Sequence, residues 1–303
     1  MELGGEVTWD SPADTSALQD YLVYLGSSSS RLQLGVLTAN ALAIPAETPK
    51  NAFDSVLVYT RSSLVEQTSP ASLWLVDNEA TVANISFMDM DLDKADLGGV
   101  ITWTPAGADE LVTQYAVYFA ESLCEEEANE TSDAYGENST AAPLCNWLHI
   151  ETVNSSNTSI QLPAETPLLN YTHLAVFTRS VLVEQRTPGQ GPISDASASV
   201  GQLTFHDLDL DDSQLGGDIA WAPATGWASA RVEAYHIYLA PDEAASQRQL
   251  LGRRSLGEEA LAVPPETDMF AYSYITAFTS SSLAEQRPQY VVASALRKDV
   301  DAI

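Results

Sequence analysis

Basic residues, histidine and cysteine are scarce in this sequence, and each shortage removes a class of function. The 303 residues hold 13 lysines and arginines against 42 aspartates and glutamates, for a formal net charge of −29 at pH 7. Binding to nucleic acid depends on clustered lysine and arginine that neutralise phosphates, so we expect no nucleic-acid partner. No apolar run approaches the roughly 20 residues that a helix needs to cross a bilayer, so we expect no direct insertion into a membrane.

Motifs of known catalytic sites are also missing. The four histidines stand in unrelated contexts. The sequence holds no Gly-x-Ser-x-Gly, His-Glu-x-x-His or Cys-x-x-Cys motif, and no glycine-rich phosphate loop. We therefore expect that the protein is not an enzyme and that it needs no organic cofactor.

Internal repetition is what the sequence has in abundance. An acidic stretch that runs into Leu-Gly-Gly and tryptophan occurs at Asp89–Trp103 and at Asp207–Trp221, and its second half occurs at Leu3–Trp9. Each copy continues with Tyr-x-x-Tyr, then Pro-Ala-Glu-Thr or Pro-Pro-Glu-Thr, and closes on Leu-x-Glu-Gln. Such self-similarity predicts three copies of one structural unit, which we name copy 1, copy 2 and copy 3. Their predicted boundaries are 1–81, 82–199 and 200–303.

The hydrophobic pattern inside each copy alternates with a period of two. In Val100–Trp103, valine and threonine point to one face, and isoleucine and tryptophan point to the other. Short runs rich in β-branched and aromatic residues, such as Gln114–Ala120, are typical of strands between turns. The sequence therefore predicts an all-β fold of three tandem antiparallel β-sandwiches in an extended array.

Four features of copy 2 resemble the fibronectin type III module and, more broadly, immunoglobulin-like β-sandwiches. Trp103 stands where that family has a core tryptophan on its second strand, and Tyr115–Tyr118 stands on the third strand. The step Leu162–Pro163 and the run Tyr171–Phe177 match the family's hydrophobic–proline turn and its sixth strand. Copies 1 and 3 carry the same series after their own tryptophans. The resemblance implies a tandem fibronectin type III-like or immunoglobulin-like repeat protein.

Copy 1 lacks the first strand that the other two copies have. Segments Asn84–Phe87 and Gln202–Phe205 have the pattern of that strand in copies 2 and 3, and no such segment precedes Leu3. An unpaired sheet edge is a place where another strand can add. We expect that the missing strand is either truncated or supplied by another chain.

Copy 2 is longer than the others because of an insert, which we predict at 121–158. Tyr118 and Pro163 are 45 positions apart, whereas the corresponding intervals in copies 1 and 3 are 21 and 26. The insert holds both cysteines, Cys124 and Cys145, at the ends of one polar loop. A disulfide that closes about 20 residues would stabilise the fold by about 3 kcal/mol. We predict this disulfide; the alternative is two free thiols.

Glycosylation sequons point to the secretory route. Six of the ten asparagines begin an Asn-x-Ser/Thr sequon, and five of the six lie in the insert or just after it. Glycosylation marks surface loops of secreted proteins, so we expect an extracellular or cell-surface glycoprotein. The predicted sites are Asn84, Asn129, Asn138, Asn154, Asn157 and Asn170.

Alternating aspartates are the strongest candidate for a binding site. In an extended chain every second side chain projects to one face, so the carboxylates of Asp-x-Asp-x-Asp crowd together and repel one another. A hard cation relieves this repulsion, and Ca²⁺ takes about six to eight oxygen ligands. In a sandwich the Pro-Ala-Glu loop lies at the same pole and adds a glutamate. The alternative is a solvated acidic turn. The predicted Ca²⁺ ligands are Asp89, Asp91, Asp93 and Glu165 in copy 2, and Asp207, Asp209, Asp211 and Glu266 in copy 3.

The closing Leu-x-Glu-Gln turns, at Leu64, Leu182 and Leu283, are predicted to be structural. We expect each leucine to plug the end of its own sandwich. We expect the glutamate and glutamine side chains to bond to neighbouring backbone.

These features predict a structural or adhesive segment of a large extracellular or surface repeat protein, acting as a stiff spacer or a fibre-forming element. No secretory signal precedes copy 1, so we expect a window of a longer array. The expected partners are neighbouring domains of that array or other copies of the chain. The alternative is a carbohydrate- or ligand-binding module that takes glycans on Trp74, Trp147 and Trp227. Clustering of these tryptophans on one face of one copy would favour glycan binding, and scatter would favour the spacer.

Overall fold

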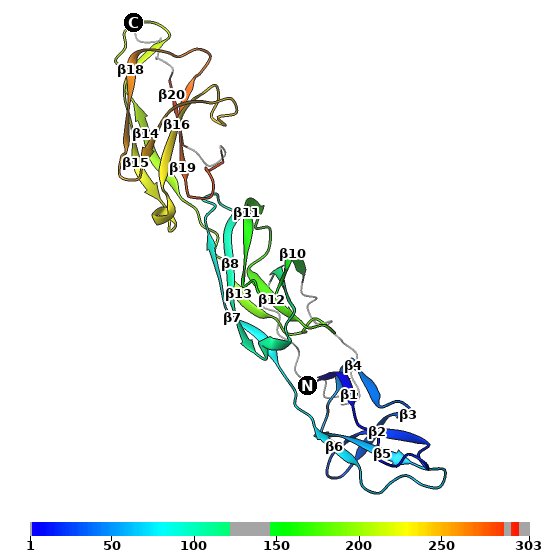
Figure 1. Cartoon of the computed structure of the whole chain (residues 1–303). Helices are drawn as coiled ribbons and strands as arrows, with labels where there is room; N and C mark the ends of the chain where they lie inside the picture. Colours follow the sequence, from blue (N-terminus) through cyan, green and yellow to red (C-terminus); the bar gives the residue numbers. More distant parts are fainter. Residues whose placement is uncertain (1, 122–145, 288–291, 297–303) are drawn as a thin grey trace, which may run out of the picture. The chain divides into compact units, whose positions relative to one another are not determined.

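The computed structural model of the chain describes residues 2–121, 146–287 and 292–296. In these segments the chain forms twenty strands and two single-turn 3₁₀ helices, at Asp109–Leu111 and Ser229–Arg231 (Figure 1). The predicted all-β fold is confirmed. None of the described segments forms a helix that is long and apolar enough to span a bilayer.

Copy 1 folds into a two-stranded and a four-stranded antiparallel sheet. The smaller sheet pairs β1 with β4, and the larger sheet has the order β3-β2-β5-β6. The strand bounds are β1 Glu2–Thr8, β2 Asp20–Gly26, β3 Arg31–Leu37, β4 Ala41–Pro49, β5 Ser55–Arg61 and β6 Ala71–Trp74.

Copy 2 has a three-stranded sheet, β11-β8-β7, and a four-stranded sheet, β10-β9-β12-β13. A three-stranded sheet and a four-stranded sheet in this order are what the resemblance to fibronectin type III modules implies. The strand bounds are β7 Ala80–Asp89, β8 Asp96–Gly107, β9 Gln114–Ala120, β10 Trp147–Asn154, β11 Ser159–Pro167, β12 His173–Arg179 and β13 Gly189–Pro192.

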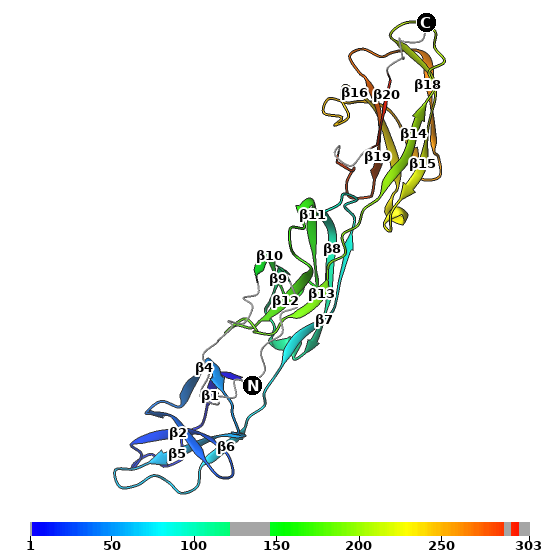
Figure 2. The ribbon, with the colours of Figure 1, turned by 180° about the vertical axis from the view of Figure 1, so that it is seen from behind.

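Copy 3 repeats this arrangement, with sheets β14-β15-β18 and β17-β16-β19-β20. The two sheets lie side by side in both views (Figures 1 and 2), and their inner faces share one hydrophobic cluster. The strand bounds are β14 Ser199–Phe205, β15 Gln214–Thr225, β16 Ala234–Ala240, β17 Gln249–Ser255, β18 Ala260–Asp268, β19 Tyr274–Ser280 and β20 Val292–Ala295.

The chain divides into two compact units, and the boundary between them passes through copy 2. The division into three domains at 1–81, 82–199 and 200–303 therefore stays a prediction. The first unit comprises Met1–Val82, Pro105–Ala116 and Phe177–Pro188, and the second comprises Ala83–Thr104, Val117–Val176 and Gly189–Ile303.

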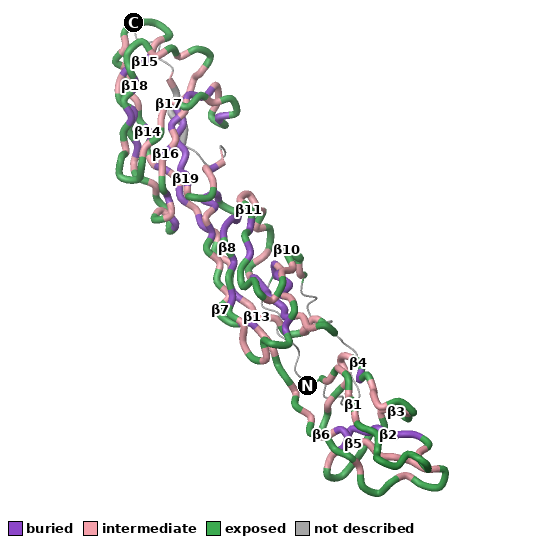
Figure 3. The backbone as a smooth tube through the Cα atoms, in the orientation of Figure 1, coloured by how far each residue is buried: buried purple, intermediate pink, exposed green. Residues whose placement is uncertain are grey.

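The alternation that the sequence predicts is present in strands β8, β15 and β16, whereas β2, β12 and β19 are buried along almost their whole length. In Figure 3 buried positions follow the central strands, such as β16 and β19 of copy 3. Trp221 packs edge-on against Tyr235 of the same copy, with ring centroids 5.6 Å apart, and Trp9 packs in the same way against Tyr21 at 5.4 Å. Tryptophan and the first tyrosine of Tyr-x-x-Tyr thus pair within their own copy in these two cases.

The sheet edge predicted for copy 1 is present. Strand β1 has one neighbour in the described chain, β4, whereas its counterparts β8 and β15 each have two. Trp9 is only half-buried, while Trp103 and Trp221 are 4% exposed. A third strand covers this side of the core in copies 2 and 3, which explains the difference.

The predicted insert at 121–158 contains a regular strand. β10 occupies Trp147–Asn154 and pairs beside β9, as β3 and β17 do in the other copies. The extra chain is therefore shorter than predicted, because the interval between Tyr118 and Pro163 also spans this strand. Four predicted residues fall at 122–145 and lie outside the described residues, so the disulfide gains no support from the structure: Cys124, Cys145, Asn129 and Asn138.

Candidate functional site

The acidic segment of copy 2 is buried, which is unusual for charged side chains. Asp89, Asp91 and Asp93 are at most 1% exposed, and Asp96 is also buried. β7 ends at Asp89 and β8 begins at Asp96, so the segment is the turn between these two strands. Buried carboxylates need hydrogen-bond donors, and here the donors come from several parts of the second compact unit.

Asp89 ties this turn to the segment that leads into copy 3. Its Oδ1 accepts the N–H groups of Asp91 (3.2 Å) and Gly98 (2.9 Å). Its Oδ2 accepts the N–H of Ala196 (2.7 Å), which lies just before β14. Burial raises the pKa of Asp89 to about 6, although the three N–H groups favour the charged form.

Asp91 holds the Pro-Ala-Glu-Thr turn of copy 2. Its Oδ2 accepts the N–H of Glu165 at 2.7 Å, and its Oδ1 accepts the N–H of Asp93 at 3.1 Å. Glu165 has a φ of 65°, in the left-handed region that is strained for a residue with a side chain. Thr166 closes the turn by donating its Oγ1 hydroxyl to the carbonyl of Pro163 at 2.7 Å. Copy 3 repeats all four features, which explains why the motif recurs.

Arg287 supplies a positive charge to this site, directly after the Leu-x-Glu-Gln loop of copy 3. Its backbone N–H donates to Asp93 Oδ2 at 2.7 Å. Its guanidinium forms ion pairs with Asp96, at 3.2 Å, and with Glu165. Burial is the main reason why the pKa of Asp93 is raised to about 7. The arginine thus offsets part of the repulsion among these carboxylates.

The two glycines of the Leu-Gly-Gly motif have separate roles. A Cβ at Gly98 would lie 2.7 Å from Ala164 Cα and 2.7 Å from Leu283 Cδ2, so this glycine leaves room for a leucine of copy 3. Gly99 has a φ of 144°, and a Cβ there would lie 2.1 Å from the carbonyl oxygen of Met88. The motif serves one close approach within copy 2 and another between copies 2 and 3.

Leu92 links the same turn to the core of copy 3. It is 2% exposed and belongs to the hydrophobic cluster that contains Val200 and Trp221. Ser281 of copy 3 adds a hydrogen bond from its Oγ to the carbonyl of Met90 at 2.5 Å. The buried leucine, the arginine and the backbone hydrogen bonds together form a specific junction between copies 2 and 3.

A similar pairing occurs within the first compact unit. A Cβ added at Gly4 would lie 3.3 Å from Leu182 Cδ1, so a leucine again lies over the first glycine of a Gly-Gly pair. Arg186 forms ion pairs with Glu2, at 2.8 Å, and with Glu47. Glu47 is the glutamate of the Pro-Ala-Glu-Thr turn in copy 1. A Leu-x-Glu-Gln-Arg loop therefore meets a face of glycine and carboxylates twice in this chain.

The predicted role of the loop leucines, to plug their own sandwich, is wrong. Leu64, Leu182 and Leu283 are 92%, 54% and 37% exposed. The two that are less exposed lie over a glycine of the preceding copy. Leucine's hydrophobicity indicates burial, but it does not say against which part of the chain.

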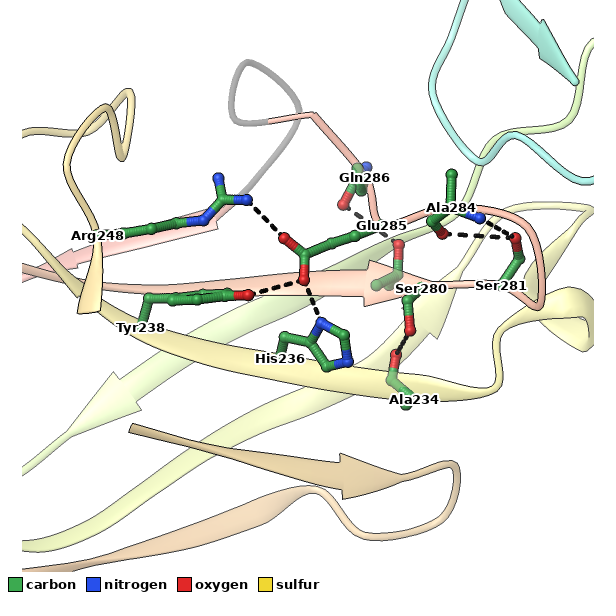
Figure 4. Close-up of polar contacts among 10 residues, drawn as sticks. Ala234, His236, Tyr238, Arg248, Ser280, Ser281, Ala284, Glu285 and Gln286 are labelled. Carbon is green, nitrogen blue, oxygen red and sulfur yellow. Dashed lines mark hydrogen bonds and ion pairs between the residues drawn. The ribbon is translucent and has the colours of Figure 1, made fainter. Parts of the chain in front are cut away.

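Glu285 fixes the loop of copy 3 from the outer face of its sheet (Figure 4). Its carboxylate accepts hydrogen bonds from Tyr238 Oη at 2.9 Å and from Arg248 at 2.6 Å, and it contacts His236 Nδ1. The Arg248 guanidinium also covers the ring of Phe278, 4.2 Å from its centroid. In copy 1 the corresponding glutamate has the same tyrosine and arginine partners.

The prediction that these glutamate and glutamine side chains bond to backbone is also wrong. The Gln286 side chain accepts a bond from the Thr279 hydroxyl at 3.3 Å, and the other copies have the same pair. The sequence feature that could have indicated a side-chain partner for the glutamate is the second tyrosine of Tyr-x-x-Tyr. Residues three apart on a strand face opposite sides, so this tyrosine could not share the core with the first.

The structure brings together two groups of the predicted Ca²⁺ ligands. Carboxylate oxygens lie within 4.8 Å of one another in the group Asp91, Asp93 and Glu165 and in the group Asp209, Asp211 and Glu266. Three close carboxylates suit a hard cation. Asp89 and Asp207 stay outside these groups and accept backbone N–H groups of their own turns. In copy 2 the guanidinium of Arg287 already lies against the group.

The remaining predicted residues lie apart from this junction. Four sequon asparagines are described, and all four are exposed: Asn84, Asn154, Asn157 and Asn170. Their glycosylation stays a prediction.

The three tryptophans suggested for glycan stacking belong to three different copies. Trp74 lies on β6, Trp147 begins β10, and Trp227 precedes the second 3₁₀ helix. The indole N–H of Trp227 donates to the carbonyl of Asp195 at 3.1 Å, which gives this ring a structural role. The three tryptophans therefore do not cluster on one face of one copy.

Comparisons with known proteins concern the fold. No family model matches the sequence, and no curated protein does. Among solved structures, the chicken CNTN1 FN1–FN3 domains are similar with a TM-score of 0.30 and 12% identity, over 98% of this chain and 95% of that one. Titin domains A168–A170 give 0.31 and 9%, over 92% and 88%. A two-domain fibronectin type III segment of chicken tenascin gives 0.26 and 11%, over 73% and 100%.

The strand order, rather than these alignments, carries the classification. A three-stranded sheet and a four-stranded sheet recur in the same order in copies 2 and 3. The chain therefore has a tandem fibronectin type III-like β-sandwich fold.

Proposed function

We propose that this chain is a structural or adhesive segment of a large extracellular or surface-exposed repeat protein. It acts there as a stiff spacer or a fibre-forming element, and we assign it no catalytic role. The observation that carries the proposal is the junction between copies 2 and 3, where Leu92 and Arg287 cross from one copy to the other.

The stiffness of the junction between copies 2 and 3 follows from the contacts that bending would break. Opening the junction would return Leu92 to water and separate Arg287 from the buried carboxylate of Asp93. It would also break the ion pairs of the Arg287 guanidinium with Asp96 and Glu165, which are partly exposed and therefore contribute less than a fully buried pair would. The junction therefore resists bending more than a solvated linker does.

An extracellular setting is supported by the surface of the chain. The net charge of −29 keeps copies of the protein apart in solution, and salt outside the cell screens that repulsion. The four exposed sequons are accessible to a glycan. The partners in this proposal are neighbouring domains of the same array.

Small-angle X-ray scattering tests the proposed stiffness. Arg287→Glu places a negative charge against Asp93, Asp96 and Glu165, and should broaden the distribution of distances in the full chain. Arg253→Glu makes the same change of charge at an exposed position of β17 and should leave the scattering unchanged. Identical curves for wild type and Arg287→Glu would remove the support for a stiff spacer.

Calcium binding at the group Asp209, Asp211 and Glu266 is a separate prediction. This group is more exposed than its counterpart in copy 2. Millimolar calcium should raise the melting temperature of the wild-type chain, and Asp211→Asn should reduce that increase. Equal melting temperatures in calcium and in EDTA would remove the metal site from the account.

A further inference from the structure

We propose that strand β1 of copy 1 binds an extended segment of another polypeptide along its outer edge, the edge that faces away from β4. The segment adds to the sheet as a third strand. Its pattern is an apolar residue, any residue and phenylalanine, as in residues 85–87 of copy 2 and 203–205 of copy 3. This inference goes beyond the proposed function, because it gives copy 1 a peptide-binding site.

The backbone of β1 directs hydrogen-bonding groups to this outer edge. Among the described strands β1 pairs only with β4, while β8 and β15 each pair with two strands. On the β4 side, the N–H of Trp9 donates to the carbonyl of Asn40 at 3.1 Å. Because neighbouring residues of a strand direct their N–H and C=O groups to opposite edges, Glu6 and Thr8 direct theirs to the outer edge. Such an edge is a template for a further strand.

Gly5 marks the place where the backbone of the added strand fits. Its counterparts, Gly99 and Gly217, have φ values of 144° and 138°. A Cβ on Gly99 would lie 2.1 Å from the carbonyl oxygen of Met88, and one on Gly217 would lie 2.5 Å from that of His206. Gly5 has the same conformation, with a φ of 139°, but a Cβ there would have nothing within 4 Å. Copy 1 therefore keeps the backbone that admits a neighbouring strand, and the space for that strand is open.

The apolar side chains of β1 have surface that an added strand would cover. Leu3, Val7 and Trp9 pack on the core of copy 1 but are only half-buried. In copy 3 the third strand contributes Leu203 to the hydrophobic cluster, and Phe205 packs against that cluster. Burial of apolar surface would therefore favour a strand with two such side chains. The counterparts of the three β1 residues are at most 4% exposed: Leu97, Ile101, Trp103, Leu215, Ile219 and Trp221.

The pairing of β14 with β15 gives the direction and the register of the added strand. These two strands are antiparallel, and Phe205 lies opposite Ile219. Val7 is the counterpart of Ile219 in β1, so the phenylalanine of the added strand lies opposite Val7. Residues 85–87 and 203–205 already belong to β7 and β14, each of which lies in a three-stranded sheet. The donor of the added strand is therefore a separate polypeptide.

Binding of a synthetic peptide to the full chain tests the inference. The peptide has the sequence of residues 197–207, and its affinity is measured by isothermal titration calorimetry. At saturation, hydrogen exchange at the N–H groups of Glu6 and Thr8 should slow at least about tenfold, because these groups gain carbonyl partners. A peptide with Leu203→Asp and Phe205→Asp is the matched control, and its dissociation constant should be at least about tenfold higher.

A substitution at Gly5 tests where the peptide binds. Gly5→Ala should raise the dissociation constant at least about tenfold, because the new Cβ takes the place of a carbonyl oxygen of the peptide. Gly257→Ala is the matched control. Gly257 also has a positive φ, of 93°, and nothing within 4 Å of a Cβ, but it lies in a turn of copy 3. Gly257→Ala should leave binding unchanged, and the melting temperatures of both variants report on folding.

Three results would overturn the inference: equal affinity for the two peptides, unchanged exchange at Glu6 and Thr8 with the first peptide in excess, or a folded Gly5→Ala chain that binds as tightly as the wild type. The two peptides are compared on the unaltered chain, so that comparison holds even where Gly5→Ala fails to fold. The scattering experiment on Arg287→Glu reads the junction between copies 2 and 3. If Arg287→Glu loosens the chain while the peptides bind equally, the proposed function stands and only the edge inference fails.

Discussion

Gly99 has a backbone conformation and a close contact that alanine cannot share. Its φ is 144°, and a Cβ would lie 2.1 Å from a carbonyl oxygen, whereas Gly5 has a φ of 139° with nothing within 4 Å. Alanine at either site incurs strain of order 1–3 kcal/mol. Gly99→Ala should cost a further ~1–3 kcal/mol for the clash. Calorimetry should therefore show a larger drop in melting temperature for Gly99→Ala than for Gly5→Ala, and equal drops would contradict the account.

Asp93 should make the stability of the chain depend on pH. Burial raises its pKa from the ordinary 3.8 to about 7, and that of Asp89 to about 6. Between the ordinary pKa and the raised pKa, the folded chain holds protons that the unfolded chain has released. The free energy of unfolding therefore falls as the pH rises from about 4 to about 7. Asp93→Asn should flatten this decline and be most stabilising above pH 7. Thermal melts in EDTA across this range check the slope, and an unchanged slope would refute it.

At the scale of residues, the sequence could predict which side chains meet but not what neutralises them. The period of two and the shared pole of the loops bring Asp91, Asp93 and Glu165 together, as expected. The burial of the two aspartates could not be foreseen, because Arg287, which contacts this group, is far away in the sequence and lies in another copy. Asp-x-Asp-x-Asp looks the same whether water, a metal ion or an arginine faces it.

The loop that ends each copy depends on its glutamate. Glu285 joins Tyr238 and Arg248 in a partly buried cluster with charge-assisted hydrogen bonds. Glu285→Ala should lower stability by about 2–3 kcal/mol, since it leaves those donors without their acceptor. Glu258→Ala removes an exposed glutamate that accepts one bond from a neighbouring N–H and should cost less than about 1 kcal/mol. Thermal unfolding of both variants checks the difference, and equal losses would show that the cluster is not stabilising.

At the scale of strands, the alternating pattern predicted the sheets well and the loops poorly. The strand candidates before the acidic segments correspond to β7 and β14. Copy 1 has the predicted unpaired sheet edge. The strand β10 was hidden inside the predicted insert, because comparison of interval lengths does not show where the extra residues enter. Copy 3 has β17 at the same place in its sheet. Alignment of copy 2 on that strand would have separated β10 from the extra residues.

The whole molecule is organised by contacts between copies as much as within them. Leucine, arginine and glycine recur at fixed places in the repeat, and the structure joins them across two junctions. Sequence repetition alone predicted a series of sandwiches but gave no indication of which repeated residues face the next copy.

Hydrogen exchange at Ala196 tests the central claim most directly. Its N–H, in the segment that leads into copy 3, donates to the buried carboxylate of Asp89 at the junction, so it should exchange slowly in the wild type and in Arg253→Glu. Arg287→Glu should speed its exchange at least about tenfold, because the junction then opens more often. An Ala196 amide that exchanges in the wild type as fast as an unstructured peptide, or one that Arg287→Glu leaves unchanged, would contradict the account.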